Sequence, residues 1–346
     1  MAILKNFIWQ ETKVKDLFNY ASLSIMGLGK NTGKTMFLNA LVDLKETSFP
    51  ERILAITSIG RDGEEKDVVT KGKKPRIYIP EGTLVATSKG LLSRCDVTKE
   101  ILKTTGIYSA MGEVVLFRSL SDGYVEIAGP SRSGDLKTLE QMIRQVSPEA
   151  LFLVDGALSR MSFSTETEAS VLCTGVNLHK DLVKVQEKTL HALYCLKLPK
   201  SPVDSPKGNH RVYVHQGHWK EVEVKEAHLM DALGPMLEDS VEGIYIRGAV
   251  TESLVDKLLT KKNFRDLFLV GKDGTKFLLG EEMTLRLKRR NITLFVENPL
   301  YVPMILVNPY DLQGLKVPVD TLTKRLEEET KMPVFVLDDL GRSGDY

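Results

Sequence analysis

The chain has few cysteines, almost no net charge and no long hydrophobic run. Its three cysteines, Cys95, Cys173 and Cys195, are far apart in the 346 residues and lack the spacing of a metal site. So few cysteines indicate a reducing compartment. No apolar run approaches the length of a membrane span, and the N-terminal residues lack the apolar core and cleavage site of a signal peptide. We therefore expect a cytoplasmic protein that does not enter a membrane.

Positive and negative charges nearly cancel. The 47 Lys and Arg residues stand against 46 Asp and Glu residues, a formal net charge of +1, so overall charge gives no reason to expect a nucleic-acid partner. Two local basic runs, Lys71–Arg76 and Arg286–Arg290, are interpreted as solvated surface. No G-x-S-x-G nucleophile elbow occurs, which leaves covalent hydrolase chemistry without support.

The most informative feature is a glycine-rich stretch directly after the apolar run Leu23–Met26. A strand, a glycine-rich loop and a helix in this order form a phosphate-binding loop, because the glycines let backbone N–H groups face the phosphates and the helix adds its positive end. We expect Lys34 to reach the β- and γ-phosphates as a catalytic residue and Thr35 to ligate Mg²⁺. The complete set expected to bind ATP in the loop is Gly27, Gly29, Lys30, Asn31, Thr32, Gly33, Lys34 and Thr35.

The spacing of this loop departs from the common pattern. The usual form would place its first glycine at Leu28, whereas here it is Gly27, giving G-x5-G-K-T. The loop resembles the branch of P-loop proteins that includes dethiobiotin synthetase, the cobyrinate-type amidation enzymes and, more loosely, the MinD and ParA ATPases. In MinD-like proteins a lysine five residues before the loop lysine reaches a partner subunit's nucleotide. Lys30 lies four residues before Lys34, so a homodimer of this kind depends on Lys30, which is otherwise a solvated loop residue.

Three acidic residues are candidates for the metal site, in or just past predicted strands. We rank Glu126 first, then Asp62 and then Asp155, and we also expect Asp62 to orient the attacking group. Glu126 stands in Val125-Glu-Ile-Ala-Gly129, which resembles a metal-binding run of dethiobiotin synthetase, although Ile127 replaces a glycine. Asp155 ends the apolar run Leu151–Asp155 in the manner of a Walker B strand. For each acid the other interpretation is a residue that caps a turn or a helix.

Asn308, in the turn that follows a late strand, is the candidate contact for the nucleotide base. Its amide can both donate to and accept from a purine edge, although Asn-Pro also starts ordinary turns. His210, His215 and His218 do not support a zinc site, because His210 and His215 would point to opposite faces of a strand.

Apolar β-rich runs alternate with helical stretches through the first two hundred residues, which predicts an α/β fold of the P-loop NTPase type. We expect a mostly parallel sheet flanked by helices, with a helix at Thr98–Thr104 and a strand at Leu193–Leu198. A Pro- and Ser-rich segment, Pro199–Gly208, is interpreted as a linker. It divides a nucleotide-binding domain at residues 1–200 from residues 209–346, which form either a second α/β domain or an extension of the same sheet.

Taken together, these segments resemble the P-loop component of the lysine 5,6-aminomutase reactivation system. The matching segments are the glycine-rich loop, Thr57–Glu64, Val125–Ser131, Val154–Arg160 and Val307–Tyr310. The resemblance implies a slow ATPase that acts as a chaperone for a cobalamin-dependent aminomutase, often beside a MutS-like partner. ATP and Mg²⁺ would set its conformation.

Two other functions remain open. One is an ATP-dependent ligase that activates a small carboxylate, as dethiobiotin synthetase does, with Glu81–Ser121 as a source for the acid pocket. The other is a ParA-like switch dimer. The sequence alone does not separate these alternatives.

Overall fold

The computed structural model describes residues 13–59, 77–157, 166–223 and 241–337. It divides the chain into two compact units. The first unit contains residues 1–189 and 302–346, and the second contains residues 190–301. The division therefore differs from the one predicted, because the last 45 residues belong with the first unit and residues 190–301 are inserted into it.

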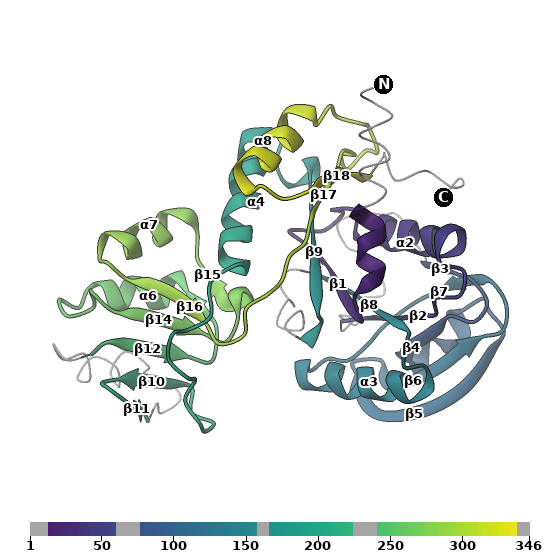
Figure 1. The fold of residues 1–346 in the computed structure, drawn as a ribbon, viewed down its shortest axis with the longest axis horizontal. Helices are drawn as coiled ribbons and strands as arrows, with labels where there is room; N and C mark the ends of the chain where they lie inside the picture. The colour runs from purple at the N-terminus through teal and green to yellow at the C-terminus, as the bar shows by residue number, and fades with distance from the viewer. Residues whose placement is uncertain (1–12, 60–76, 158–165, 224–240, 338–346) are drawn as a thin grey trace. The chain divides into compact units, whose positions relative to one another are not determined.

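The first unit is built on a nine-stranded sheet (Figure 1). In sheet order its strands are β18 (Val334–Val336), β17 (Ile305–Asn308), β9 (Ala169–Gly175), β1 (Ser22–Gly27), β8 (Leu151–Ala157), β2 (Leu54–Ser58), β4 (Leu84–Ser88), β6 (Gly112–Ser119) and β5 (Lys99–Ser109). All neighbours from β18 to β4 pair in parallel, whereas β6 and β5 pair antiparallel. The predicted α/β fold with a large, mostly parallel sheet is confirmed.

The central strands are apolar because helices cover both faces of the sheet. Strands β1 and β9 are buried along their whole length, as expected for parallel strands between two layers. Residues of the helix α2 (Lys34–Ser48) and the short helix η1 (Asp16–Asn19) pack on one face, and residues of α3 (Ser133–Val146) pack on the other. The remaining elements are β3 (Ile77–Ile79), η2 (Lys89–Arg94), β7 (Gly123–Val125), η4 (Val176–Leu178), α4 (Leu182–Leu196) and α8 (Asp320–Thr330).

The second unit has its own five-stranded sheet and its own core. The strand order is β11 (Trp219–Glu221), β10 (Val212–His215), β12 (Gly243–Ile246), β14 (Phe268–Gly271) and β16 (Thr293–Val296). Strands β12, β14 and β16 are parallel and are connected through α6 (Glu252–Leu259) and α7 (Glu281–Arg289). The minor elements are β13 (Val250–Thr251), η6 (Gly274–Lys276) and β15 (Phe277–Leu278).

Three local predictions were wrong. Of residues 98–104, where a helix was predicted, all but the first form the start of the edge strand β5, because pairing with β6 overrides a weak local preference. Residues 193–196 are the last turn of α4 rather than a strand. The supposed linker begins as part of the second unit: Ser201 donates from its backbone to Val296, and Val296 in turn donates to Pro199, both at or below 2.9 Å.

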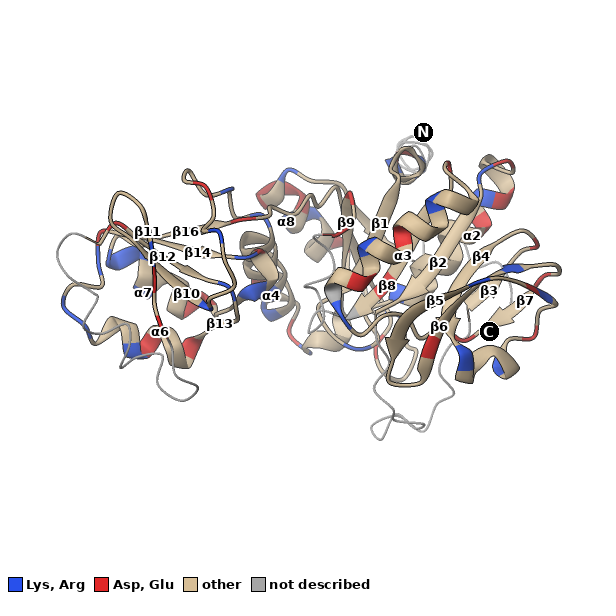
Figure 2. Cartoon of the chain, turned by 90° about the horizontal axis from the view of Figure 1, so that it is seen from below, with Lys and Arg blue, Asp and Glu red and all other residues tan. Residues whose placement is uncertain are grey.

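Among the described residues no helix is both long and apolar enough to cross a membrane. Acidic and basic residues are interspersed along the ribbon of both units (Figure 2), in keeping with the near-zero net charge of the sequence.

The return of β17 to the first sheet after the inserted unit predicts which leucines matter for the stability of the fold. Leu306 on β17 is fully buried, whereas Leu312, six residues later, is 66% exposed. Leu306→Ala should lower the free energy of unfolding by about 2–5 kcal/mol, because it removes buried methyl groups and leaves a cavity. Leu312→Ala should change it by about 0.5 kcal/mol or less. Urea unfolding of both variants checks this, and equal effects would contradict the packing of β17 into the first sheet.

Candidate functional site

The glycine-rich loop joins the end of β1 to the start of α2. Strand β1 lies between β8 and β9, with Gly27 beside Cys173 in the parallel register, and Leu28 donates to the Cys173 carbonyl at 2.9 Å. The loop is thus anchored in the middle of the sheet at the carboxyl ends of its parallel strands. This is where open α/β sheets bind their ligands.

Glycine is required at two positions of the loop for different reasons. Gly33 is the N-cap of α2 and has φ +84°, a left-handed conformation that side chains disfavour. At Gly27 a Cβ would lie 2.5 Å from Lys34 Nζ and 2.3 Å from Thr32 Oγ1. The absence of a side chain at Gly27 therefore makes the space that the Lys34 ammonium and the Thr32 hydroxyl use.

Lys34 and Thr35 occupy the first turn of α2, as predicted. The Lys34 ammonium turns back over the loop and donates to the Gly29 carbonyl at 3.0 Å, and the buried Thr32 hydroxyl donates to the same carbonyl at 3.2 Å. The Thr35 hydroxyl makes no hydrogen bond to any residue that the structure describes. One ammonium and one uncommitted hydroxyl therefore lie at the N-terminus of a helix, where the helix dipole favours an anion.

Two asparagines from neighbouring strands hold the loop backbone. Asn177, just past β9, donates its amide to the Lys30 carbonyl. Asn308, at the end of β17, donates to the Asn31 carbonyl at 2.8 Å and accepts from the Tyr310 backbone at 3.2 Å. Because both amides bind carbonyls of consecutive residues, they fix the peptide planes in the middle of the loop, where Asn31 has φ 57°.

The sequence predicted Asn308 as a base contact and overlooked Asn177. The structure brings Asn308 to the loop, but both functional groups of its amide already have backbone partners; its role toward a base stays a prediction. The available signal for Asn177 was a polar residue two positions after Gly175, which ends a fully buried strand. The absence of a side chain at Gly175 makes space for both asparagines, since a Cβ there would lie 2.9 Å from both Asn177 Oδ1 and Asn308 Cβ.

Asp155 lies on β8, the strand next to β1. Alternation along β8 puts Phe152 and Val154 into the core cluster on the α3 side, and Leu151 and Leu153 into the cluster on the α2 side. Asp155 therefore faces the α2 side, on the same side of the sheet as the loop helix. Asp155 and Lys34 both also lie close enough to Cys173 to influence its pKa in opposite directions.

Glu126 is held beside β4, whereas Asp155 is on β8, the strand next to β1. The backbone carbonyl of Glu126 accepts from Thr87 of β4 at 3.1 Å, and its carboxylate lies 3.7 Å from the Arg94 guanidinium. Strand β4 is separated from β1 by β8 and β2, which corresponds to about 14 Å between the strand axes. The hydroxyls of Ser58, Thr87 and Ser88 bind the backbone of residues 126–129. The strand order thus favours Asp155 over Glu126 as a partner of Thr35.

Asp62, the remaining predicted acid, lies outside the described residues. Among the residues that the structure does describe, no three His, Cys, Asp or Glu side chains come together as a metal cluster. His210 and His215 bind different carboxylates, those of Glu221 and Glu242, at 2.9 and 2.7 Å.

Cys173, although next to the loop, is an inert thiol. Burial raises its pKa to about 12, so the group stays protonated and neutral near pH 7. The nearby Lys34 ammonium lowers the pKa but does not offset burial. The site therefore has no thiolate nucleophile at this position.

Comparison with known proteins finds no family model, no curated protein and no solved structure that matches this chain. The functional argument accordingly depends on the geometry of the loop and its neighbours.

The two asparagines should control the order of the loop. Asn177→Ala or Asn308→Ala leaves a loop carbonyl without its partner, which should raise amide hydrogen exchange in residues 28–33 by about tenfold, given about 1–3 kcal/mol for such a loss. Hydrogen-exchange mass spectrometry measures this. Asn298→Ala in the second unit is the control and should leave loop exchange unchanged. Unaltered loop exchange in both asparagine variants would contradict a bracing role.

Proposed function

We propose that the glycine-rich loop binds the phosphates of ATP together with Mg²⁺. The observation that carries this proposal is the combination of Gly33 as a left-handed N-cap, Lys34 folded over the loop and two asparagines that bind loop carbonyls. With these carbonyls bound by the two amides, the N–H groups of the loop and of the first turn of α2 would be the donors for phosphate oxygens. Lys34 would offset the negative charge that develops on the transferred phosphate.

Thr35 and Asp155 are the oxygen donors that fit a magnesium ion beside the phosphates. A hydroxyl at the start of the loop helix and a carboxylate on the adjacent strand match the preference of Mg²⁺ for a few protein oxygens plus water and phosphate. The ion would neutralise phosphate charge, and Asp155 would orient one of its bound waters. Glu126, ranked first from the sequence, would act at most through water, since its strand neighbour β4 is three places from β1.

We further propose that the protein is a nucleotide-driven chaperone that reactivates a cobalamin-dependent aminomutase. The resemblance of its segments to the reactivation component supports this, and the chain topology adds a physical argument. The inserted second unit begins at Leu190 within α4, the helix that follows η4 and its Asn177, and it ends before β17, which carries Asn308. Both connections of the insert thus lead along the chain to a residue that binds the loop, which would let a change in loop conformation reach the second unit, where we place the partner surface.

Lys34→Ala should weaken ATP binding by about 10- to 100-fold and abolish hydrolysis, because it removes a charge-assisted hydrogen bond to phosphate. A fluorescent ATP analogue and a phosphate-release assay measure the two effects. Lys137→Ala, an exposed lysine on α3, is the matched control and should behave like the unaltered protein.

The same titrations at varied Mg²⁺ separate the two carboxylates. Asp155→Asn should raise the Mg²⁺ concentration needed for half-maximal hydrolysis by about tenfold or more, whereas Glu126→Gln should change it less.

A well-folded Lys34→Ala protein with unchanged ATP affinity would refute the loop assignment. The opposite order of the two carboxylate variants would restore Glu126 as the metal ligand.

The chaperone function makes a separate prediction. Phosphate release by the isolated protein should be slow and should rise about tenfold when a cobalamin-dependent aminomutase with damaged cofactor is added, because partner and nucleotide binding are reciprocally coupled in a switch. The control is the same mutase added to the Lys34→Ala protein. A panel of small carboxylic acids with ammonia or bicarbonate forms the second arm. Stoichiometric ligation product from any acid, with no response to the mutase, would favour a ligase instead.

A further inference from the structure

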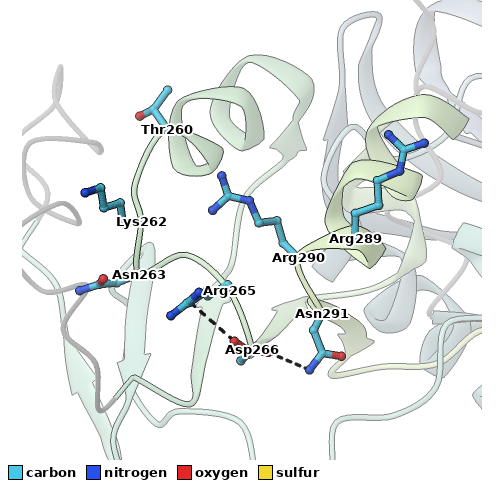
Figure 3. Close-up of a pocket in the computed structure, with 8 residues that line it drawn as sticks. All are labelled: Thr260, Lys262, Asn263, Arg265, Asp266, Arg289, Arg290 and Asn291. Carbon is cyan, nitrogen blue, oxygen red and sulfur yellow. Dashed lines mark hydrogen bonds and ion pairs between the residues drawn. The ribbon is translucent and has the colours of Figure 1, made fainter.

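The second unit contains a basic cavity that the proposed function does not use. It has a volume of about 580 Å³ and lies where α6 and α7 end and their chains turn into β14 and β16 (Figure 3). All of its lining side chains are polar or charged: Thr260, Lys262, Asn263, Arg265, Asp266, Arg289, Arg290 and Asn291. Four cations and one carboxylate leave three positive charges in excess. This concentration of charge stands out in a chain whose net charge is +1.

Hydrogen bonds join the two turns that line the cavity. Asp266 donates from its backbone to Arg290 at 3.0 Å, and the Asn291 amide donates to the Asp266 carboxylate at 3.0 Å. The Arg290 guanidinium donates to the Leu259 carbonyl at 3.0 Å, which ties the end of α7 to the end of α6. Asp266 and Asn291 both have left-handed φ angles, 53° and 55°, which Asp and Asn tolerate better than other side chains. The basic residues are therefore mounted on a cross-linked frame.

The carboxylate in the cavity does not cancel the positive charges around it. The Asp266 carboxylate accepts the Asn291 amide and lies 3.7 Å from Arg265 Nε, in a pair whose side chains are both more than 60% exposed. Such an exposed ion pair contributes little to stability, and it involves only Nε of the Arg265 guanidinium. The side chains of Lys262 and Arg289 make no hydrogen bond or ion pair with any residue in the described parts of the chain. Two cations from different turns are thus available to a ligand.

Stabilisation of helix ends explains only part of this cluster. Arg289 and Arg290 lie at the C-terminus of α7, where the helix dipole favours positive charge. Lys262 and Arg265, however, follow the last residue of α6 by three and six positions, beyond the turn over which that effect acts. Both residues line the cavity together with Arg289 and Arg290 (Figure 3), so the helix ends do not account for all of its positive charge.

We propose that this cavity binds a small anion that carries two or more phosphate groups. Its volume lies within the usual range of about 300–1,000 Å³ for small-molecule sites and exceeds what one phosphate would fill. Guanidinium groups match phosphate oxygens in pairs, and Thr260, Asn263 and Asn291 add neutral polar side chains to the lining. This site is separate from the glycine-rich loop, and the inference holds whether or not that loop binds ATP.

Inorganic pyrophosphate titrated into the full-length Lys34→Ala protein tests the site, since this background removes the loop lysine. Calorimetry should show binding that weakens with added salt. The double variant Lys262→Gln/Arg289→Gln should lose affinity about tenfold or more. The matched double variant Lys257→Gln/Lys261→Gln removes two lysines near the end of α6 that do not line the cavity, and it should retain most of the affinity.

Three outcomes would overturn the inference. The first is no binding of pyrophosphate to the Lys34→Ala protein, and the second is an equal loss in the two double variants, which would indicate general charge attraction. The third is equally tight binding of citrate, which would show that the cavity selects charge rather than phosphate. Circular dichroism of each variant confirms folding, and a thermal shift produced by pyrophosphate in the control variant but absent from the Lys262→Gln/Arg289→Gln protein would support the site.

Discussion

The candidate site depends on two side-chain amides that fix the backbone of the glycine-rich loop. A loop of this kind gains affinity for phosphate only when its N–H groups are already oriented, because ordering a flexible backbone at the moment of binding costs free energy. Asn177 and Asn308 supply that order by binding the carbonyls of Lys30 and Asn31. Gly33 then allows the tight entry into α2, and the N-terminus of that helix faces the same space.

The path of the chain is what brings both amides to the loop. The first sheet is completed by β17 and β18, which come from the last 45 residues and pair in parallel beside β9. Asn308 reaches the loop only because β17 lies two strands from β1. The inserted unit therefore separates, along the sequence, two elements that cooperate at one loop. An insertion at this point gives the second unit two covalent connections to the residues that brace the loop.

The two units carry charge in different ways. In the first unit the loop combines one ammonium with backbone dipoles, which suits phosphates held next to a metal ion. In the second unit the cavity between the ends of α6 and α7 relies on four cationic side chains over a cross-linked turn. The parallel strands β12, β14 and β16 support this cavity at their amino ends, opposite to the edge that a nucleotide site would use.

The sequence by itself determined the glycine-rich loop, its flanking strand and helix, and the α/β class, because these follow from local rules: glycine at strained positions, apolar strand runs and alternation with helices. It did not determine β5, where pairing with β6 overrode local preference, or the division into units. Only the tertiary structure brought Asn177 to Lys30 and Asn308 to Asn31, across 147 and 277 positions of the chain. The tertiary structure also placed Asp155 on β8, next to β1, and Glu126 beside β4, three strands from β1. The sequence cannot predict this, because strand order is set by the packing of the whole sheet and leaves no periodic pattern in the sequence.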